Sequence, residues 1–321
     1  MTKSPKKHGK RCNIIAELCQ NHNGDLNLLK SMVKDAAEAG SDYVKIQSML
    51  ADDLSKRDRF EKGGQGIERP YQAEYDRLKP LDLDDDAHYM FIEECLKHNV
   101  KPLTTAFNRT RIDFLANLPW PEMSIKISSF DCRSHKMIQE LIDAGFKKFF
   151  ISTGTTYDSE IEETASILKD AGVEFTLFHC VSIYPSSPDT GHLNRINFLR
   201  KFSKSIGFSE HSCYDKDGLK LAIASLAYDI DYIERHFTIL PKKSTKDGVV
   251  SLNKKEMKEL SGFCQKDKED ILKYIEENIS DFDLMKGSEK RDLTYEETRN
   301  RDYYQGRFLN REEGKTFFNW E

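Results

Sequence analysis

The chain has 321 residues, with 49 Lys and Arg against 54 Asp and Glu, which gives a net charge of −5. Its 38% apolar and 11% aromatic residues are enough for a buried core, which excludes a disordered chain. The weakly acidic balance excludes a general attraction for nucleic acid, so any anion has to be captured by a local site. A membrane helix needs roughly 18 consecutive apolar residues, and no run approaches that length. Met1 to Arg11 is basic without the apolar stretch of a signal peptide, so we expect a cytoplasmic protein with no membrane or nucleic-acid partner.

Short runs rich in β-branched and aromatic residues predict eight strands. In chain order they are Asn13–Leu18, Tyr43–Gln47, Lys101–Thr105, Met123–Ile127, Lys148–Ser152, Glu174–Phe178, Ser205–Phe208 and Asp231–Glu234. Amphipathic stretches between them predict helices that stop at a glycine, the residue expected just after a helix end. Three of these are Leu26–Ala39 before Gly40, His135–Ala144 before Gly145, and Ser159–Ala171 before Gly172.

Eight repeated strand–helix units in about 270 residues match the size and rhythm of a (β/α)8 TIM barrel, an α/β fold. A doubly wound open sheet is the alternative. The regular spacing is interrupted by one long insertion, Met49–Leu83, whose Arg57–Arg77 part is either a lid or a solvated loop. Asn253–Ile279 predicts one long charged helix, and Ser280–Glu321 is polar without a predicted element. We therefore expect a single barrel domain over residues 1–280 and a short C-terminal extension over residues 281–321.

Polar residues end nearly every predicted strand, which in a parallel barrel places them together at one rim. Lys45 and Lys126 interrupt apolar strands and need an anionic partner if they are buried. Hydroxyls at the same rim are good donors to phosphate or carboxylate oxygens; they belong to Thr105, Ser129, Ser152 and Ser209. Together they predict a site for a small, highly charged anion. The alternative is that each lysine forms a salt bridge with a rim carboxylate such as Glu17 or Glu234.

His211 and His236 end the adjacent seventh and eighth strands and could share one metal ion with open coordination positions. The alternative is two structural histidines. His22 and His179 are further imidazoles at the rim, for which loop capping and packing respectively are alternatives to function. The seven cysteines are scattered and never spaced as Cys-x-x-Cys, so they indicate buried thiols rather than disulfides or a zinc site.

An ordered set of segments resembles the sialic acid synthase (N-acetylneuraminate synthase, NeuB-like) family. It starts with Ile14-Ile15-Ala16-Glu17, Asn21-His22-Asn23-Gly24 and Ala39 to Gln47. It continues with Lys126-Ile127-Ser128-Ser129, Ile151-Ser152-Thr153-Gly154, His179-Cys180 with Ile183-Tyr184-Pro185, Gly207 to Ser212 and Ile233 to Thr238. The resemblance covers about residues 13 to 265, and Glu296 to Arg307 is similar to the connector that follows the family's barrel.

The resemblance implies a C–C bond-forming transferase that condenses phosphoenolpyruvate (PEP) with the aldehyde form of an N-acylated hexosamine, giving a nonulosonic acid and phosphate. It implies a divalent metal, usually manganese with magnesium or cobalt as alternatives, on His211 and His236. It implies PEP contacts from Lys45, Thr105, Lys126, Ser129, Ser152 and Ser209. It implies sugar contacts from Gln47, Phe107, Asp131, Tyr184 and Asp247. Glu17, Asp131 and Lys126 are the expected catalytic residues, with Glu17 or Asp131 as general base.

Three departures from the family pattern leave alternatives open. Ser182 stands where N-acetylneuraminate synthases usually carry asparagine, and Asp131 stands for a more usual glutamate, so the exact sugar is not fixed. The family normally continues into a small antifreeze-like (SAF) domain, which reaches the sugar site of a partner subunit; here we expect it to be absent. The alternatives are that the Met49–Leu83 insertion replaces it, that a separate lid-supplying chain does, or that nothing does; a homodimer is a further open alternative. The alternative functions are a non-catalytic or regulatory barrel that binds sugar or PEP, and another PEP-condensing synthase that acts on a sugar phosphate.

Overall fold

The structure, a computed structural model, describes residues 12–62 and 67–321. The basic start of the chain and the Gly63-Gly64 pair in the insertion lie outside the described residues. Within the described ranges, no helix combines the length and the apolar character needed to cross a bilayer.

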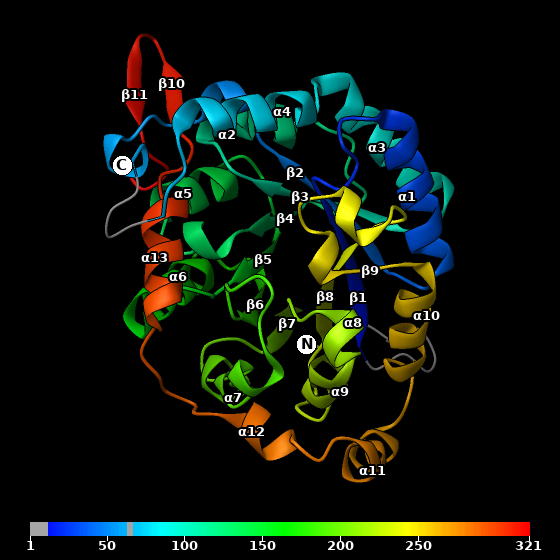
Figure 1. Ribbon diagram of the computed structural model, residues 1–321. Helices are drawn as coiled ribbons and strands as arrows, with labels where there is room; N and C mark the ends of the chain where they lie inside the picture. Colours follow the sequence, from blue (N-terminus) through cyan, green and yellow to red (C-terminus); the bar gives the residue numbers. More distant parts are fainter. Residues whose placement is uncertain (1–11, 63–66) are drawn as a thin grey trace.

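Eight parallel strands form a closed barrel, so the predicted (β/α)8 fold is confirmed (Figure 1). The strands are β1 (Asn13–Cys19), β2 (Tyr43–Ser48), β3 (Lys101–Ala106), β4 (Ser124–Ile127), β5 (Lys148–Ser152), β6 (Glu174–Cys180), β7 (Ser205–Glu210) and β8 (Tyr232–Phe237). Consecutive strands pair in order, and β1 also pairs with β8, where Glu17 lies beside His236. This last pairing closes the sheet and excludes the doubly wound alternative. A two-residue strand, β9 (Ser251–Leu252), adds to β8.

Helices surround the barrel (Figure 1). They are α1 (Leu26–Glu38), α2 (Tyr71–Leu78), α3 (Asp85–Lys97), α4 (Ile112–Ala116), α5 (His135–Asp143), α6 (Asp158–Asp170), α7 (Arg195–Leu199), α8 (Tyr214–Asp217), α9 (Lys220–Leu226), α10 (Lys254–Phe263), α11 (Lys268–Asn278), α12 (Phe282–Lys286) and α13 (Tyr295–Tyr304). The three predicted helix ends at glycine agree with α1, α5 and α6 to within two residues. At Gly40 the backbone has a φ of +95°, and a Cβ would lie 2.3 Å from Ser261 Oγ, so glycine is required there.

The alternation of side chains along the strands determines where the pocket begins. One face of each strand packs on the helices and forms the main core, for example through Ile14, Ala16 and Leu18. The other face points into the barrel, where an apolar plug fills the end at which the strands start: Ile15, Tyr43, Leu103, Phe150 and Phe178, with Tyr232 against them. Two residues further along the same strands the inward side chains are polar, so the chemistry starts directly above the plug.

The prediction of one helix over Asn253–Ile279 is wrong, because the segment forms two helices, α10 and α11. Asn253 starts α10 through a capping box with Glu256. Asp267 then adopts an extended conformation (φ −71°, ψ 158°) ahead of α11. Because α10 packs on α1 and α11 packs on α9, the chain has to change direction between them.

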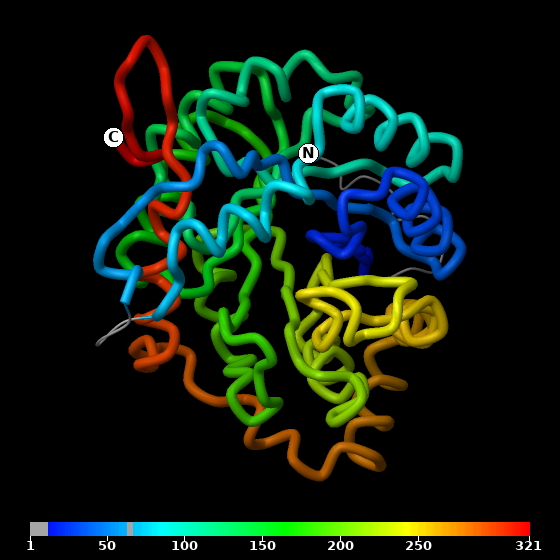
Figure 2. The backbone as a smooth tube through the Cα atoms, turned by 45° about the horizontal axis from the view of Figure 1, so that its top comes forward, coloured from blue at the N-terminus to red at the C-terminus, as the bar shows by residue number. Residues whose placement is uncertain are grey.

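Ser280–Glu321, for which no element was predicted, forms α12, α13 and a hairpin of β10 (Asn310–Glu312) and β11 (Lys315–Phe317). This segment runs back over the barrel beside the insertion (Figures 1 and 2). Backbone hydrogen bonds join the two: Ser55 N–H donates to Arg307 O at 2.8 Å, and Leu309 N–H donates to Asp53 O at 2.7 Å. The insertion is therefore neither a free lid nor a solvated loop in its described part, because it is fixed to the C-terminal segment.

Candidate active site

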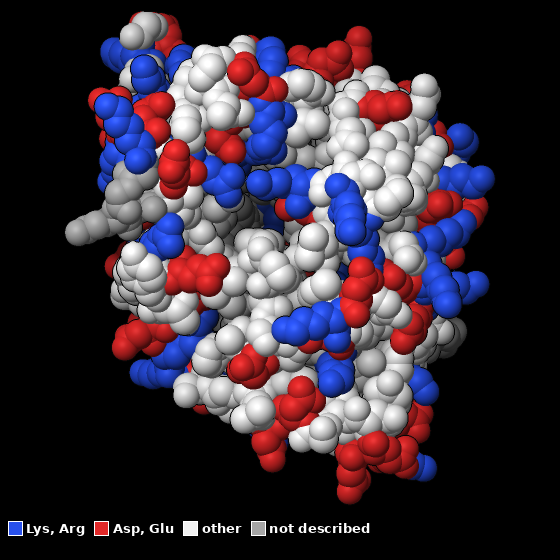
Figure 3. Space-filling model, viewed as in Figure 1, with Lys and Arg blue, Asp and Glu red and all other residues white. Residues whose placement is uncertain are grey.

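A cavity of about 510 Å³ opens at the C-terminal ends of the barrel strands. All the residues predicted to bind substrate or metal line it, namely Glu17, Lys45, Gln47, Thr105, Phe107, Lys126, Ser129, Asp131, Ser152, Tyr184, Ser209, His211, His236 and Asp247. Figure 3 shows the hollow on this face of the molecule, with Lys and Arg side chains along its margin. The residues that were predicted separately along the sequence therefore share one cavity, and their individual roles stay predictions.

Two buried lysines and two buried carboxylates form the floor of the cavity. Lys126 Nζ donates to both carboxylate oxygens of Glu234, at 2.9 and 3.0 Å. Lys45 forms a salt bridge with Glu17 and lies 3.6 Å from Glu234. The alternative interpretation of these lysines as salt-bridge partners is therefore confirmed, and it does not exclude anion binding, because the lysines also face the cavity.

Burial and charge shift the pKa values of this cluster in opposite directions. Burial raises the pKa of Glu17 from its ordinary 4.5 to about 7, although Lys45 opposes the shift. Glu234 faces both lysines, whose attraction outweighs burial and holds its pKa well below the ordinary value. Burial lowers the pKa of Lys126, whereas the pKa of Lys45 is raised because its two carboxylate neighbours outweigh burial. Glu17 is thus the member of the cluster suited to exchange a proton near neutral pH.

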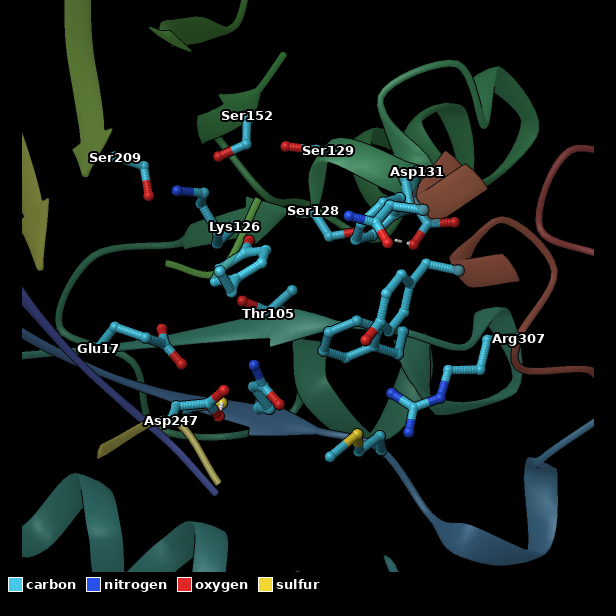
Figure 4. Close-up of a pocket in the computed structure, with 18 of the residues that line it drawn as sticks. Glu17, Thr105, Lys126, Ser128, Ser129, Asp131, Ser152, Ser209, Asp247 and Arg307 are labelled. Atoms are coloured by element: carbon cyan, nitrogen blue, oxygen red, sulfur yellow. Dashed lines mark hydrogen bonds between the residues drawn. The ribbon is translucent and has the colours of Figure 1, made fainter. Parts of the chain in front are cut away.

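Hydroxyl groups of Thr105, Ser129, Ser152 and Ser209 lie around Lys126 (Figure 4). Thr105 Oγ1 accepts a hydrogen bond from Lys45 at 3.0 Å, and Ser209 Oγ donates to Glu234 at 2.8 Å. Gly154 N–H donates to Ser129 Oγ at 3.1 Å. A Cβ at residue 154 would lie 2.3 Å from Ser182 Oγ and 2.6 Å from Cys180 Sγ, so only glycine fits there. These groups form a compact set of donors suited to phosphate or carboxylate oxygens.

The opposite wall of the cavity is built around Asp131, which Figure 4 shows away from Glu17. Asp131 accepts hydrogen bonds from Ser128 Oγ at 3.0 Å, Ser134 Oγ at 3.1 Å and Asn319 Nδ2 at 2.9 Å. Burial raises its pKa although these donors oppose the shift. With its oxygens held by three donors, Asp131 is placed to orient a ligand more than to accept a proton.

His211 and His236 face each other across the ends of β7 and β8, with ring centroids 5.5 Å apart. Burial lowers the pKa of His211 to about 4 and that of His236 well below its ordinary value, so both are neutral and able to bind a metal. His211 Nδ1 pairs with Val181 O at 3.1 Å, which leaves Nε2 toward the cavity. His236 Nδ1 is buried and has no hydrogen-bond partner among the described residues. The two imidazoles have the chemistry that a divalent metal needs, and their role as metal ligands stays a prediction.

The other two rim histidines follow the structural alternatives. His22 Nδ1 accepts a hydrogen bond from Gly24 N–H at 3.1 Å and caps the loop after β1. His179 Nε2 lies 2.7 Å from Gly191 O, and its ring stacks on Phe208. Six of the seven cysteines are buried, as expected.

The sequence reasoning missed several residues that line the cavity. Glu234 was treated only as a possible salt-bridge partner, although its spacing of two residues from His236 places it on the inward face of β8. Cys19 was treated only as a buried thiol. The C-terminal segment supplies, among others, Tyr304, Arg307, Phe308, Asn319 and Trp320. Tyr304 and Arg307 lie in the connector-like stretch noted in the sequence, but none of the five was predicted to line the pocket.

Comparison with known proteins shows which families of chains this one is similar to. The chain is 31% identical over 263 residues to the N,N'-diacetyllegionaminic acid synthase of Campylobacter jejuni, covering 78% of this chain and 75% of the relative. It is 28% identical over 258 residues to the N-acetylneuraminate-9-phosphate synthase of Drosophila melanogaster, covering 77% of this chain and 66% of that protein. The solved N-acetylneuraminic acid synthetase of Leptospira borgpetersenii, in complex with citrate, superposes with a TM-score of 0.69 at 26% identity and 92% coverage of both chains. The sequence model of the NeuB family matches residues 32–271, and the chain therefore belongs to the NeuB family.

Proposed function

We propose that this protein is a synthase of the sialic acid type, which condenses PEP with the open-chain aldehyde of an N-acylated hexosamine and yields a nonulosonic acid and phosphate. The observation that carries the proposal is the cluster of Lys45 and Lys126 with Glu17 and Glu234 below a ring of hydroxyls, beside two neutral imidazoles. A PEP-sized anion fits this donor set, and relatives named as synthases share the fold.

Binding of PEP puts its negative charge beside Lys45 and Lys126, in competition with Glu17 and Glu234. Protonation of Glu17, whose pKa is about 7, removes one of the two competing charges. The hydroxyls of Ser129, Ser152 and Ser209 then complete the contacts to phosphate and carboxylate oxygens. A divalent metal held by His211 and His236, manganese in the first instance, would supply polarisation of the acceptor's carbonyl oxygen.

In the reaction, C3 of PEP forms a bond to the aldehyde carbon as the C2–C3 double bond of PEP is lost, and protonated Glu17 gives its proton to the aldehyde oxygen. Positive charge develops at C2, and Glu17, now a carboxylate, stabilises it. Water adds at C2 and gives one proton to Glu17; the C2–O bond to phosphate then breaks as the C2 hydroxyl proton passes to the departing phosphate, which leaves the 2-keto group. Lys126 and Lys45 neutralise the departing phosphate. Asp131, Gln47, Phe107 and Tyr184 orient the acceptor, because they line the outer part of the same cavity.

We also propose that residues 281–321 form part of the acceptor side of the pocket. Asn319 bonds to Asp131, and Arg307 lines the cavity from the same segment. A homodimer is compatible with this arrangement, but no partner residue is needed for the contacts described here.

A second acceptor class is favoured by the cations at the mouth of the cavity. Arg69, Arg77 and Arg307 all contact one carboxylate, Glu74, at 3.5, 3.0 and 2.8 Å, and Lys246 lines the same opening. The local excess of positive charge suits an acceptor that carries a phosphate group. The condensing chemistry would be the same.

The test is turnover of the full-length protein with PEP, manganese and a panel of N-acyl hexosamines with and without a terminal phosphate. We expect equal amounts of phosphate and 2-keto acid, formed only when both substrates are present. The ratio of kcat/KM between phosphorylated and free sugars identifies the acceptor class. Lys126→Met should abolish PEP binding, whereas the exposed Lys101→Met should not. PEP binding without product across the whole panel would favour the non-catalytic alternative.

A further inference from the structure

Cys19, His236 and Asp247 meet in the cavity next to Glu17. Each offers a ligand atom, and these atoms all lie within 4.8 Å of one another. Cys19 Sγ donates a hydrogen bond to Asp247 Oδ2 at 2.8 Å. Cys19 ends β1, His236 lies on β8, and Asp247 follows in the loop before β9, so three separate segments converge on this point.

These three groups have the properties of a metal site rather than of a packed core. His236 is buried, with 8% of its surface exposed, and its Nδ1 has no hydrogen-bond partner among the described residues. The Cys19 thiol proton lies in the hydrogen bond between Cys19 Sγ and Asp247 Oδ2, which are 2.8 Å apart. A divalent cation that replaced this proton would bind both the sulfur and the carboxylate oxygen. In Figure 4, Asp247 lies on the Glu17 side of the pocket, away from Asp131 and Arg307.

We propose that Cys19 and Asp247 act with His236 and His211 as ligands of one divalent metal, with the sulfur of Cys19 bound as thiolate. Asp247 is then a metal ligand and not a sugar contact. His211 Nε2 faces the same cavity, with its ring centroid 5.5 Å from that of His236. Binding releases one proton, from the Cys19 thiol. This assignment adds ligands to the metal site of the proposed function, but it concerns metal binding and can be tested without turnover.

A thiolate changes which metal the site prefers. Oxygen and imidazole donors already bind cobalt and zinc more tightly than manganese, and a thiolate widens this difference because sulfur is a softer ligand. We therefore expect this protein to prefer zinc and cobalt over manganese by more than a site without sulfur would. The preference should depend on residue 19.

The experiment is an anaerobic titration of the full-length, chelator-treated and reduced protein with Co²⁺. The wild-type protein should develop a near-ultraviolet sulfur-to-cobalt charge-transfer band together with the visible cobalt bands. Cys19→Ser should lose the near-ultraviolet band and bind Co²⁺ at least about tenfold more weakly. Asp247→Asn should weaken Co²⁺ binding by a similar factor but keep the band, because the sulfur ligand is still present. Cys180→Ser is the matched control, because Cys180 also lines the cavity but lies outside the cluster, and it should keep the band.

Cys19→Gly guards against misfolding, because residue 19 has a φ of +48°, a conformation that glycine adopts without strain. This variant should keep the wild-type unfolding transition, lose the band and show a smaller preference for cobalt over manganese than the wild type. Visible cobalt bands without the sulfur band in the wild type, or a sulfur band that survives in Cys19→Gly, would overturn the assignment. Neither result depends on turnover, so failure of the proposed reaction and failure of this metal site are distinguishable.

Discussion

Glu17→Gln should make the pH dependence of stability flatter in the metal-free protein. Glu17 is fully enclosed, and burial raises its pKa from 4.5 to about 7 in the folded state. Between these two pH values the unfolded chain has lost the proton and the folded chain keeps it, so the folded state loses stability as pH rises. The difference between the two pKa values corresponds to a loss of about 3 kcal/mol in the free energy of unfolding, which is complete above pH 7. Glutamine cannot ionise and removes this loss.

The assay is urea unfolding of chelator-treated protein at several pH values from 4.5 to 8, for wild type and Glu17→Gln. Neutral buried histidines give the free energy of unfolding the opposite pH dependence, because they make the folded protein less stable as pH falls. Both proteins contain these histidines, so their contribution cancels in the difference between the two. The wild type should lose about 3 kcal/mol relative to the variant across the range. Glu93→Gln, an exposed change on α3, should show no such difference. A difference between wild type and Glu17→Gln that is constant with pH would refute the reasoning about Glu17.

Gly154→Ala should weaken PEP binding at least about tenfold and cost about 1–3 kcal/mol of stability, because its Cβ would meet three side chains within 3.0 Å. Calorimetry and urea unfolding measure both effects, and Gly262→Ala, which has open space around it, should be neutral in each. Glu234→Gln should lower the free energy of unfolding by about 3–5 kcal/mol, because Lys126 loses its charged partner. Saturating PEP should restore part of this stability in thermal melts, and no restoration would argue against contact between PEP and Lys126. Asn319→Ala should raise the KM for the acceptor and leave the KM for PEP unchanged, and an equal rise in both would contradict its placement on the acceptor side.

The inner half of the site could be predicted from the sequence because it is determined by local periodicity. Strand residues alternate, so Ile15 and Glu17 face inward together, as do Tyr43 and Lys45. Once eight strands were recognised, the next inward-facing residue after each apolar plug residue had to lie at the same rim. The pattern did not determine which of these side chains bond to one another.

Pairing depends on contacts across the barrel, which sequence separation hides. Lys126 and Glu234 are 108 residues apart, and Cys19 and Asp247 are 228 apart. The position of Cys19 also depends on a local irregularity, because the β1–β2 register shifts between Glu17 and Cys19. No simple repeat in the sequence marks such a shift.

The part of the outer wall that the insertion and the C-terminal segment build could not be predicted, because the two segments hold each other. Polar contacts help to anchor the C-terminal segment on the barrel, such as Arg301 to Glu160 at 2.6 Å and Asn300 to Ser182 O at 2.8 Å. Phe308 packs in a cluster with Leu54 and Leu78 of the insertion, and the adjoining backbones are hydrogen-bonded. Neither segment has a defined position without the other, so each of the two segments, read separately, resembles a polar loop. This part of the pocket exists only where both segments meet, so its shape depends on a long-range contact and not on the barrel strands alone.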